Sequence, residues 1–110
     1  TMSSAALASL TIASVVAFTA VPTSAAEPSP ERQVELRNLL VQDCGSCHGL
    51  TLAGGLGPSL QAGSLKDKPP EYLAATILYG RPGTAMPPWH PFLSVEEADW
   101  LAQLLKQPAQ

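Results

Sequence analysis

The chain lacks the features that mark several large classes of protein. With only two cysteines among 110 residues, it has no framework of disulfide bonds. It has no run of basic residues and no basic residues interleaved with aromatic ones, and its formal net charge is -3. Nothing therefore indicates a nucleic-acid partner. No stretch has the convincing alternation of a β-strand, and the length allows one small domain at most. These absences favour a small domain built from helices.

The first 26 residues also lack charge altogether. Leu7 to Val21 is rich in apolar side chains, and small residues suited to cleavage follow as far as Ala26. This pattern resembles a secretory signal peptide, although the usual basic N-terminal region is missing. The apolar run is shorter than the ~20 residues of a membrane-spanning helix, and Ser and Thr interrupt it. We expect residues 1–26 to be cleaved and residues 27–110 to form the exported domain. An uncleaved membrane anchor is the alternative.

Both cysteines belong to one motif, Cys44-Gly45-Ser46-Cys47-His48. Cys-x-x-Cys-His is the pattern of covalent c-type haem attachment. Each thiol adds to one haem vinyl group, and the two-residue spacing lets both sulfurs reach the same macrocycle. His48 follows directly, where its imidazole is in place to be the proximal ligand of the iron. The motif therefore predicts one covalently bound haem c.

Two other interpretations of these cysteines stay open at this point. The pair could form a redox-active or structural disulfide, which is expected beside a strand-helix-strand pattern that this chain lacks. It could also bind zinc together with His48 and His90, but ligand histidines usually stand well away from the cysteine pair. The size of the chain favours haem, because so small a domain has a marginal core that a large apolar cofactor would complete. Export agrees with this, since c-type haem is generally attached outside the cytoplasm.

Three segments have the patterns of helices. Ser29 and Pro30 are start signals for a helix from about Glu31 to Asp43, in which Leu36, Leu39 and Leu40 share one face. A second helix begins at Pro69-Pro70, runs to about Tyr79 and stops at Gly80.

The third helix has the clearest signals. It begins with the capping box Ser94-Val95-Glu96-Glu97 and ends before Pro108. One face of this helix is apolar and consists of Val95, Ala98, Leu101, Ala102 and Leu105. We expect it to pack on the first helix.

The segments between these helices are expected to be irregular. Glycines are frequent from Gly49 to Leu60 and exclude a stable helix there, so we expect a loop folded against the haem. Prolines exclude regular structure from Arg81 to Phe92. This second loop contains Met86, the only methionine outside the leader. A lone Met is usually core filler, but a thioether held in a stiff loop after a haem motif is a candidate second axial ligand. His90 is its rival.

Taken in order, these features resemble the class I cytochromes c. The resemblance is carried by the Cys44–His48 motif, by Gly57-Pro58-x-Leu60, by Met86-Pro87 and by the flanking helices. It implies an all-α fold with three main helices and loops wrapped around one covalently bound haem. It also implies that Cys44 and Cys47 attach the haem and that His48 and Met86 are the axial ligands. The backbone carbonyl of Pro58 would orient His48.

A closer resemblance is to the cytochrome c-55X group of denitrifying bacteria. Four stretches carry it: 43–50, 54–58, 80–89 and 93–101. This resemblance implies association with cytochrome cd1 nitrite reductase, as its electron donor or as a helper in making its haem d1. We therefore expect a monomeric periplasmic electron carrier with a redox partner protein, no nucleic acid and no small-molecule substrate, which is not an enzyme. The alternatives are an accessory protein in haem d1 biosynthesis and a ligand-binding or peroxidase-like haem protein in which Met86 is displaced.

Overall fold

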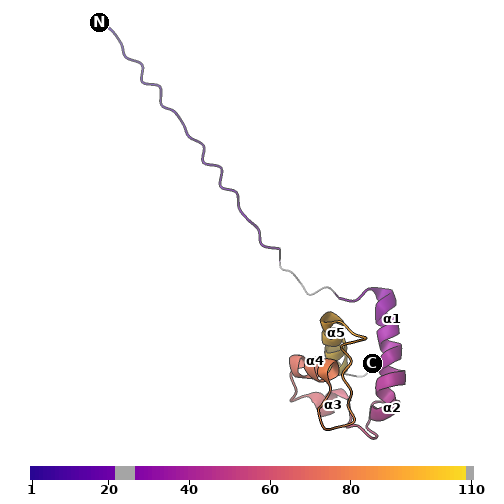
Figure 1. Cartoon of the computed structure of the whole chain (residues 1–110). Coiled ribbons are helices and arrows are strands. Elements are labelled where there is room, and N and C mark those ends of the chain that lie inside the picture. Colours follow the sequence, from indigo (N-terminus) through magenta and orange to yellow (C-terminus); the bar gives the residue numbers. More distant parts are fainter. Residues whose placement is uncertain (22–26, 109–110) are drawn as a thin grey trace.

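The computed structural model describes residues 1–21 and 27–108, and within these ranges the regular structure is helical, with no strand. The elements, shown in Figure 1, are α1 (Pro30–Leu39), the π-helical turn η1 (Leu40–Cys44), α2 (Gly45–His48), α3 (Ala62–Leu65), α4 (Pro70–Tyr79) and α5 (Val95–Lys106). The expected helical character and the irregular segments 49–60 and 81–92 are both present.

Residues 1–21 contain no helix or strand, and their side chains are exposed. Figure 1 shows this segment leading away from the helices. Among the residues that the structure describes, no helix is both long enough and apolar enough to span a membrane. The expected cleavage position after Ala26 lies outside the described residues, so the signal peptide stays a prediction.

The first helix begins where the sequence indicates and then changes its hydrogen bonding. The Ser29 hydroxyl accepts a hydrogen bond from the backbone N–H of Arg32, at 3.2 Å. The α-helical pattern ends at Leu39, and the N–H of Gly45 bonds instead to the carbonyl of Leu40, five residues back. A continuous α-helix to Asp43 is therefore the wrong description of this segment. The wider turn rotates the following residues relative to the apolar face of α1, as extra residues in π-turns do.

The core is made of leucine and alanine side chains from α1, η1, α3, α4 and α5, together with Leu93 from the loop before α5. Leu36 and Leu101 are its largest fully buried side chains. The complete set of buried apolar residues is Leu36, Leu40, Leu65, Leu73, Ala74, Leu78, Leu93, Ala98, Leu101, Ala102 and Leu105. Four of the five expected apolar-face residues of α5 belong to this set, whereas Val95, in the first turn, is exposed. Helix α5 packs most extensively on α4.

The first and last helices also meet, as the sequence analysis expected. Arg32 Nε donates to Glu97 Oε1 at 2.7 Å, and a terminal guanidinium nitrogen donates to Oε2 at 3.2 Å. One turn further along, the Arg37 guanidinium lies 5.4 Å from the centroid of the Trp100 ring. Together with the buried Leu36, these contacts attach α1 to α5.

Helix α3 is a single turn that the sequence analysis did not predict. It is stabilised from a distance, because the Lys106 ammonium at the end of α5 donates to the carbonyl oxygens of Leu65, Lys66 and Lys68. These carbonyls lie at and just after the C-terminus of α3, where helices leave acceptors without partners and where a cation is favourable.

Glu97 has two roles in this arrangement. Its carboxylate accepts the backbone N–H of Ser94 at 3.1 Å, which completes the capping box, and it also binds Arg32. The hydrogen bond from Arg32 holds the pKa of Glu97 below its usual value of 4.5. The ionised carboxylate therefore stabilises both the start of α5 and its contact with α1.

We predict that Glu97→Gln lowers the free energy of unfolding by about 1 kcal/mol at neutral pH. Because folding lowers the pKa of Glu97, this contribution is present above pH 4.5 and is lost as the pH falls through the lowered value. Denaturant unfolding at several pH values measures the difference. Glu96→Gln, in the same helical turn, is the matched control and should change little. An equal effect of the two substitutions would contradict the role given to Glu97.

Candidate haem site

The cysteine motif lies at the end of the first helical segment. Cys44 is the last residue of η1 and is half-buried, and Cys47 in α2 is exposed. Both are free thiols, so no disulfide joins them. Burial raises the pKa of the Cys44 thiol to about 11, with a further contribution from the charge of Asp43. A thiol with such a pKa is protonated at neutral pH, and this disfavours thiolate redox chemistry.

The zinc interpretation also lacks a ligand set. Within residues 1–21 and 27–108, no group of three or more His, Cys, Asp or Glu side chains is placed to hold a metal ion. Cys44, Cys47 and His48 are therefore not joined by His90 in a tetrahedral arrangement. His90 is exposed, and its ring lies 6.2 Å from that of Tyr79, centroid to centroid.

His48 is fixed by one short hydrogen bond. Its Nδ1 lies 2.7 Å from the carbonyl oxygen of Pro58. A carbonyl oxygen can only accept, so Nδ1 must carry the hydrogen. In the neutral imidazole, Nε2 then keeps its lone pair, which is the form that binds a metal. Pro58 and His48 thus lie together, with the ring in the tautomer that a proximal ligand requires.

The glycines of the loop 49–60 allow this contact. A Cβ at Gly57 would lie 2.7 Å from both Cε1 and Nδ1 of His48, so any side chain there would strike the ring. A Cβ at Gly55 would lie 2.8 Å from the carbonyl oxygen of Cys47. The N–H of Gly57 donates to this carbonyl and that of Gly54 to the carbonyl of His48, both at 2.8 Å. The loop therefore packs directly on the motif.

Met86 is held by the end of α4. It is half-buried in the loop 81–92, and its carbonyl accepts the N–H of Arg81 at 3.2 Å. Further along, the N–H groups of Trp89 and His90 donate to the carbonyls of Ile77 and Leu78, each at 3.0 Å. The first half of the loop thus closes on itself between Arg81 and Met86, and the second half is attached to the last turns of α4.

Gly80 makes the close approach of this loop possible. Its φ is +67°, which glycine adopts without strain. A Cβ at this position would lie 2.6 Å from the carbonyl oxygen of Met86 and 2.8 Å from the carbonyl carbon of Pro87. Gly80 is the helix stop that the sequence predicts, and its contact with the Met86 backbone is a second reason for a glycine there.

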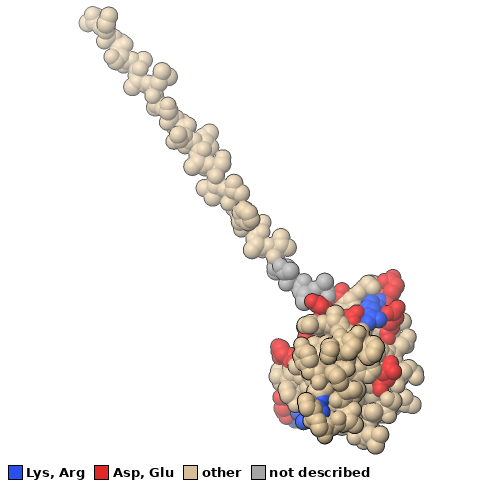
Figure 2. Space-filling view, viewed as in Figure 1, with Lys and Arg blue, Asp and Glu red and all other residues tan. Residues whose placement is uncertain are grey.

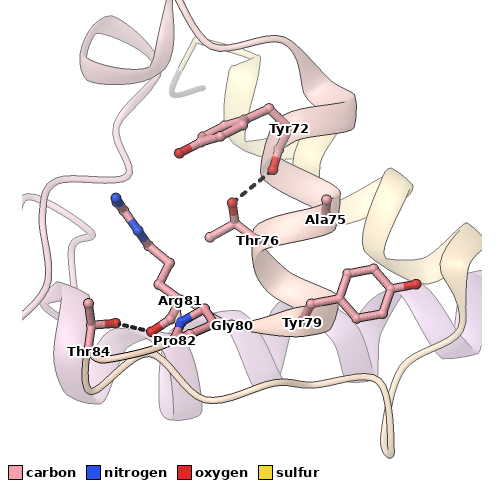
Figure 3. Close-up of a pocket in the computed structure, with 8 residues that line it drawn as sticks. All are labelled: Tyr72, Ala75, Thr76, Tyr79, Gly80, Arg81, Pro82 and Thr84. Carbon is pink, nitrogen blue, oxygen red and sulfur yellow. Dashed lines mark hydrogen bonds between the residues drawn. The ribbon is translucent and has the colours of Figure 1, made fainter.

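A cavity of about 400 Å³ lies between α4 and the start of the Met86 loop (Figure 3). Tyr72 and Thr76 line it from α4, and Arg81 and Thr84 line it from the loop. The Thr84 hydroxyl donates to the Arg81 carbonyl at 2.7 Å, whereas no described residue forms a hydrogen bond or ion pair with the Arg81 guanidinium. An unpaired guanidinium beside aromatic and aliphatic walls suits an apolar ligand that bears carboxylates. The two cysteines, His48 and Met86 do not line this cavity.

The donor set fits a c-type haem. Two free sulfurs stand at the attachment spacing, an imidazole has its Nε2 lone pair free, and a thioether lies in a separately fixed loop. Imidazole and thioether are the pair of axial ligands found in cytochromes c.

Comparison with known proteins agrees with this chemistry. A family model described as "Cytochrome C oxidase, cbb3-type, subunit III" matches residues 32–105. The chain is 58% identical over 78 residues to cytochrome c55X of Pseudomonas aeruginosa, which covers 71% of this chain and 66% of that protein. It is 51% identical over 81 residues to cytochrome c55X of Paracoccus denitrificans, covering 74% of this chain and 79% of that one.

Two solved structures are similar as well. One is described as the c-type cytochrome NirC and has a TM-score of 0.71 at 57% identity, covering 72% of this chain and 93% of that chain. The other is described as dihydro-heme d1 dehydrogenase NirN in complex with DHE. Its TM-score is 0.62 at 37% identity, covering 66% of this chain but 16% of that chain.

The chain therefore belongs to the c-type cytochromes, with the class I cytochrome c fold and covalently bound haem c, a family of electron carriers rather than enzymes. Within this class its relatives are the cytochromes c55X. The expectations of an all-α class I fold and of haem c are confirmed.

We predict that Gly57→Ala lowers the yield of haem-bearing protein roughly tenfold, because the added methyl group displaces the His48 ring from the Pro58 carbonyl. Gly63→Ala is the matched control, since a Cβ there would meet nothing within 4 Å. Haem content per polypeptide is measured from the absorbance of the denatured protein. If both variants carried haem as the parent does, the close contact at Gly57 would have no importance for the site.

Proposed function

We propose that this chain is a periplasmic single-haem electron carrier that donates electrons to cytochrome cd1 nitrite reductase during denitrification. In this proposal Cys44 and Cys47 attach the haem, and His48 and Met86 are the axial ligands. The observation that carries the proposal is the 2.7 Å contact of His48 Nδ1 with the Pro58 carbonyl, which leaves Nε2 available for iron.

The bound haem supplies a reversible one-electron couple between ferrous and ferric iron. His48 and Met86 would hold the iron, and with both bound no position would remain for a substrate. The Pro58 carbonyl keeps the His48 ring in one tautomer and one orientation, so no proton has to move when the electron does. The Met86 thioether and the exclusion of water both favour the ferrous state and should raise the potential.

Two arguments support the periplasmic location. Residues 1–26 have the uncharged apolar run and the small residues of a secretory leader. Covalent haem attachment of the c-type also takes place outside the cytoplasm. The nitrite reductase partner is inferred from the resemblance to the c-55X group, and relatives named cytochrome c55X support it.

A second candidate function is a role in making haem d1. It is supported by the similarity to the structure described as dihydro-heme d1 dehydrogenase NirN in complex with DHE. The similarity covers 16% of that chain, so most of that protein has no counterpart here. The redox centre of an accessory protein could be the same as that of a carrier.

We predict that Met86→Ala abolishes the weak near-infrared band of the oxidised protein, which reports the bond between iron and sulfur. The variant should also bind carbon monoxide rapidly when reduced, whereas the parent protein should not. Rapid binding by the parent would instead favour the ligand-binding or peroxidase-like alternative. An unchanged spectrum of Met86→Ala would refute the ligand assignment.

Two glycine variants refine this test without removing the sulfur. Gly80→Ala should weaken the near-infrared band, because its Cβ would strike the Met86 backbone. Gly83→Ala has the same left-handed strain, with φ +79°, but its Cβ meets nothing within 4 Å. It should therefore keep the band, which separates the clash from the strain.

Deletion of the gene distinguishes the two candidate functions. We expect the deletion strain to contain nitrite reductase with a normal amount of haem d1 and to reduce nitrite more slowly. Reductase that lacked haem d1 would support the biosynthetic role instead. Stopped-flow mixing of the reduced protein with purified oxidised reductase then measures the electron transfer directly.

A further inference from the structure

The two segments that form the site carry almost no charge. No Asp, Glu, Lys or Arg lies between Cys44 and Leu65, and none lies between Pro82 and Val95. All the proposed attachment, ligand and orienting residues fall within these two segments. Between Tyr72 and Val95 the single charged side chain is Arg81. The net charge of -3 therefore arises from other parts of the chain.

The charged residues gather on the elements that surround the site segments. They lie on α1, on the stretch 66–71 that includes the start of α4, and on the polar side of α5, while Asp43 lies in η1 directly before Cys44. Figure 2 shows charged atoms towards the edges of the view, over α1 and beside α3 and α4, around a broad tan area. The two site segments themselves thus carry no charged side chain, and Asp43 and Arg81 are the charges directly before them.

Large apolar side chains are exposed in and beside the same segments. On the His48 side, Leu50 is 69% exposed and Leu56, between Gly55 and Gly57, is 94% exposed. On the Met86 side, Phe92 is 69% exposed, and its ring meets that of Trp89 edge-on. We call Leu50, Leu56 and Phe92 the apolar rim. An uncharged surface with exposed apolar side chains is typical of a recognition site.

We propose that redox partners dock on the apolar rim through an uncharged, apolar face of their own, and that long-range charge does not steer this encounter. The proposal rests on the carrier function given above. Steering requires opposite charges on the two docking faces, and it makes the association rate fall steeply as salt is added. A face without charge gives neither effect. Redox encounters are small and short-lived, so a few exposed apolar side chains are a sufficient contact.

Electron self-exchange tests this proposal without a foreign partner. Oxidised and reduced molecules of the haem-bearing chain are mixed, and the exchange rate is taken from the broadening of haem resonances in NMR spectra. Two copies meet with the same uncharged rim, so we expect the rate to change less than about twofold between ~0.02 and ~0.5 M ionic strength. A tenfold rise with salt would show that like charges face each other in the encounter and would overturn the proposal.

Charge placed on the rim should create the missing salt dependence. Leu56→Glu and Leu56→Lys bring like charges together when two copies meet. Each variant should therefore exchange electrons roughly tenfold more slowly at low salt, and its rate should recover at high salt. Val34→Glu is the matched control, because Val34 on α1 is 59% exposed and lies outside the site segments. It should leave the rate unchanged. Unaltered absorption spectra and midpoint potentials would show that docking, and not the haem, has changed. Equal slowing by Val34→Glu would overturn the proposal.

Transfer to oxidised cytochrome cd1 nitrite reductase, measured by stopped flow, separates this proposal from the proposed function. If the reductase accepts electrons and the rate is insensitive to salt, both proposals stand. If it accepts none while self-exchange remains insensitive to salt, the docking proposal stands and the reductase partner is wrong. If it accepts electrons at a rate that falls tenfold with salt, the partner is right and docking through an uncharged face is wrong.

Discussion

The site depends on the hydrogen bond between His48 Nδ1 and the carbonyl oxygen of Pro58. Because this acceptor has no hydrogen to give, the bond determines the tautomer of the ring and leaves Nε2 free. It also ties the loop 49–60 to the motif, since Pro58 reaches the ring only when the chain passes close to it at Gly57. One side-chain contact thereby sets both the orientation of the imidazole and the path of the loop.

Met86, the proposed second ligand, is positioned by different elements. The motif follows α1 through η1, whereas the Met86 loop is attached to the last turns of α4. The two helices that hold these segments, α1 and α4, are joined through α5. Helix α4 packs on its apolar face, and α1 meets it through Leu36 and through the ion pair of Arg32 with Glu97. The relative placement of imidazole and thioether is thus a property of the helical core rather than of either loop.

Local signals were sufficient to predict much of this arrangement. The capping box at Ser94, the stop at Gly80 and the spacing of the cysteine motif each involve neighbours within a few residues, and the structure has the corresponding caps and helix ends. The failures arise where distant contacts decide the outcome. Helix α3 depends on Lys106, about 40 residues away in sequence. The π-turn of η1 occurs among residues with ordinary helix propensity, so no local pattern distinguishes it from an α-helix.

The role of the loop glycines was only half predicted. We expected their loop to fold against the haem, and in the structure the glycines approach the imidazole of His48 and the backbone of the motif itself. A sequence can indicate that close approach is needed at Gly57, because glycine alone lacks a Cβ, but it cannot identify the partner, which only the folded loop brings near.

The scarcity of charge around the site affects the electron itself as well as the docking of partners. The iron changes its charge by one unit in each transfer, and every fixed charge nearby shifts the balance between its two states. Asp43 and Arg81 are the charged side chains directly before the two site segments, and within the segments that balance is left to the proposed axial ligands and to the exclusion of water. An uncharged partner face covering the apolar rim brings no new charge close to the iron. Docking then leaves the potential nearly unchanged, and the driving force measured for the free protein applies within the complex.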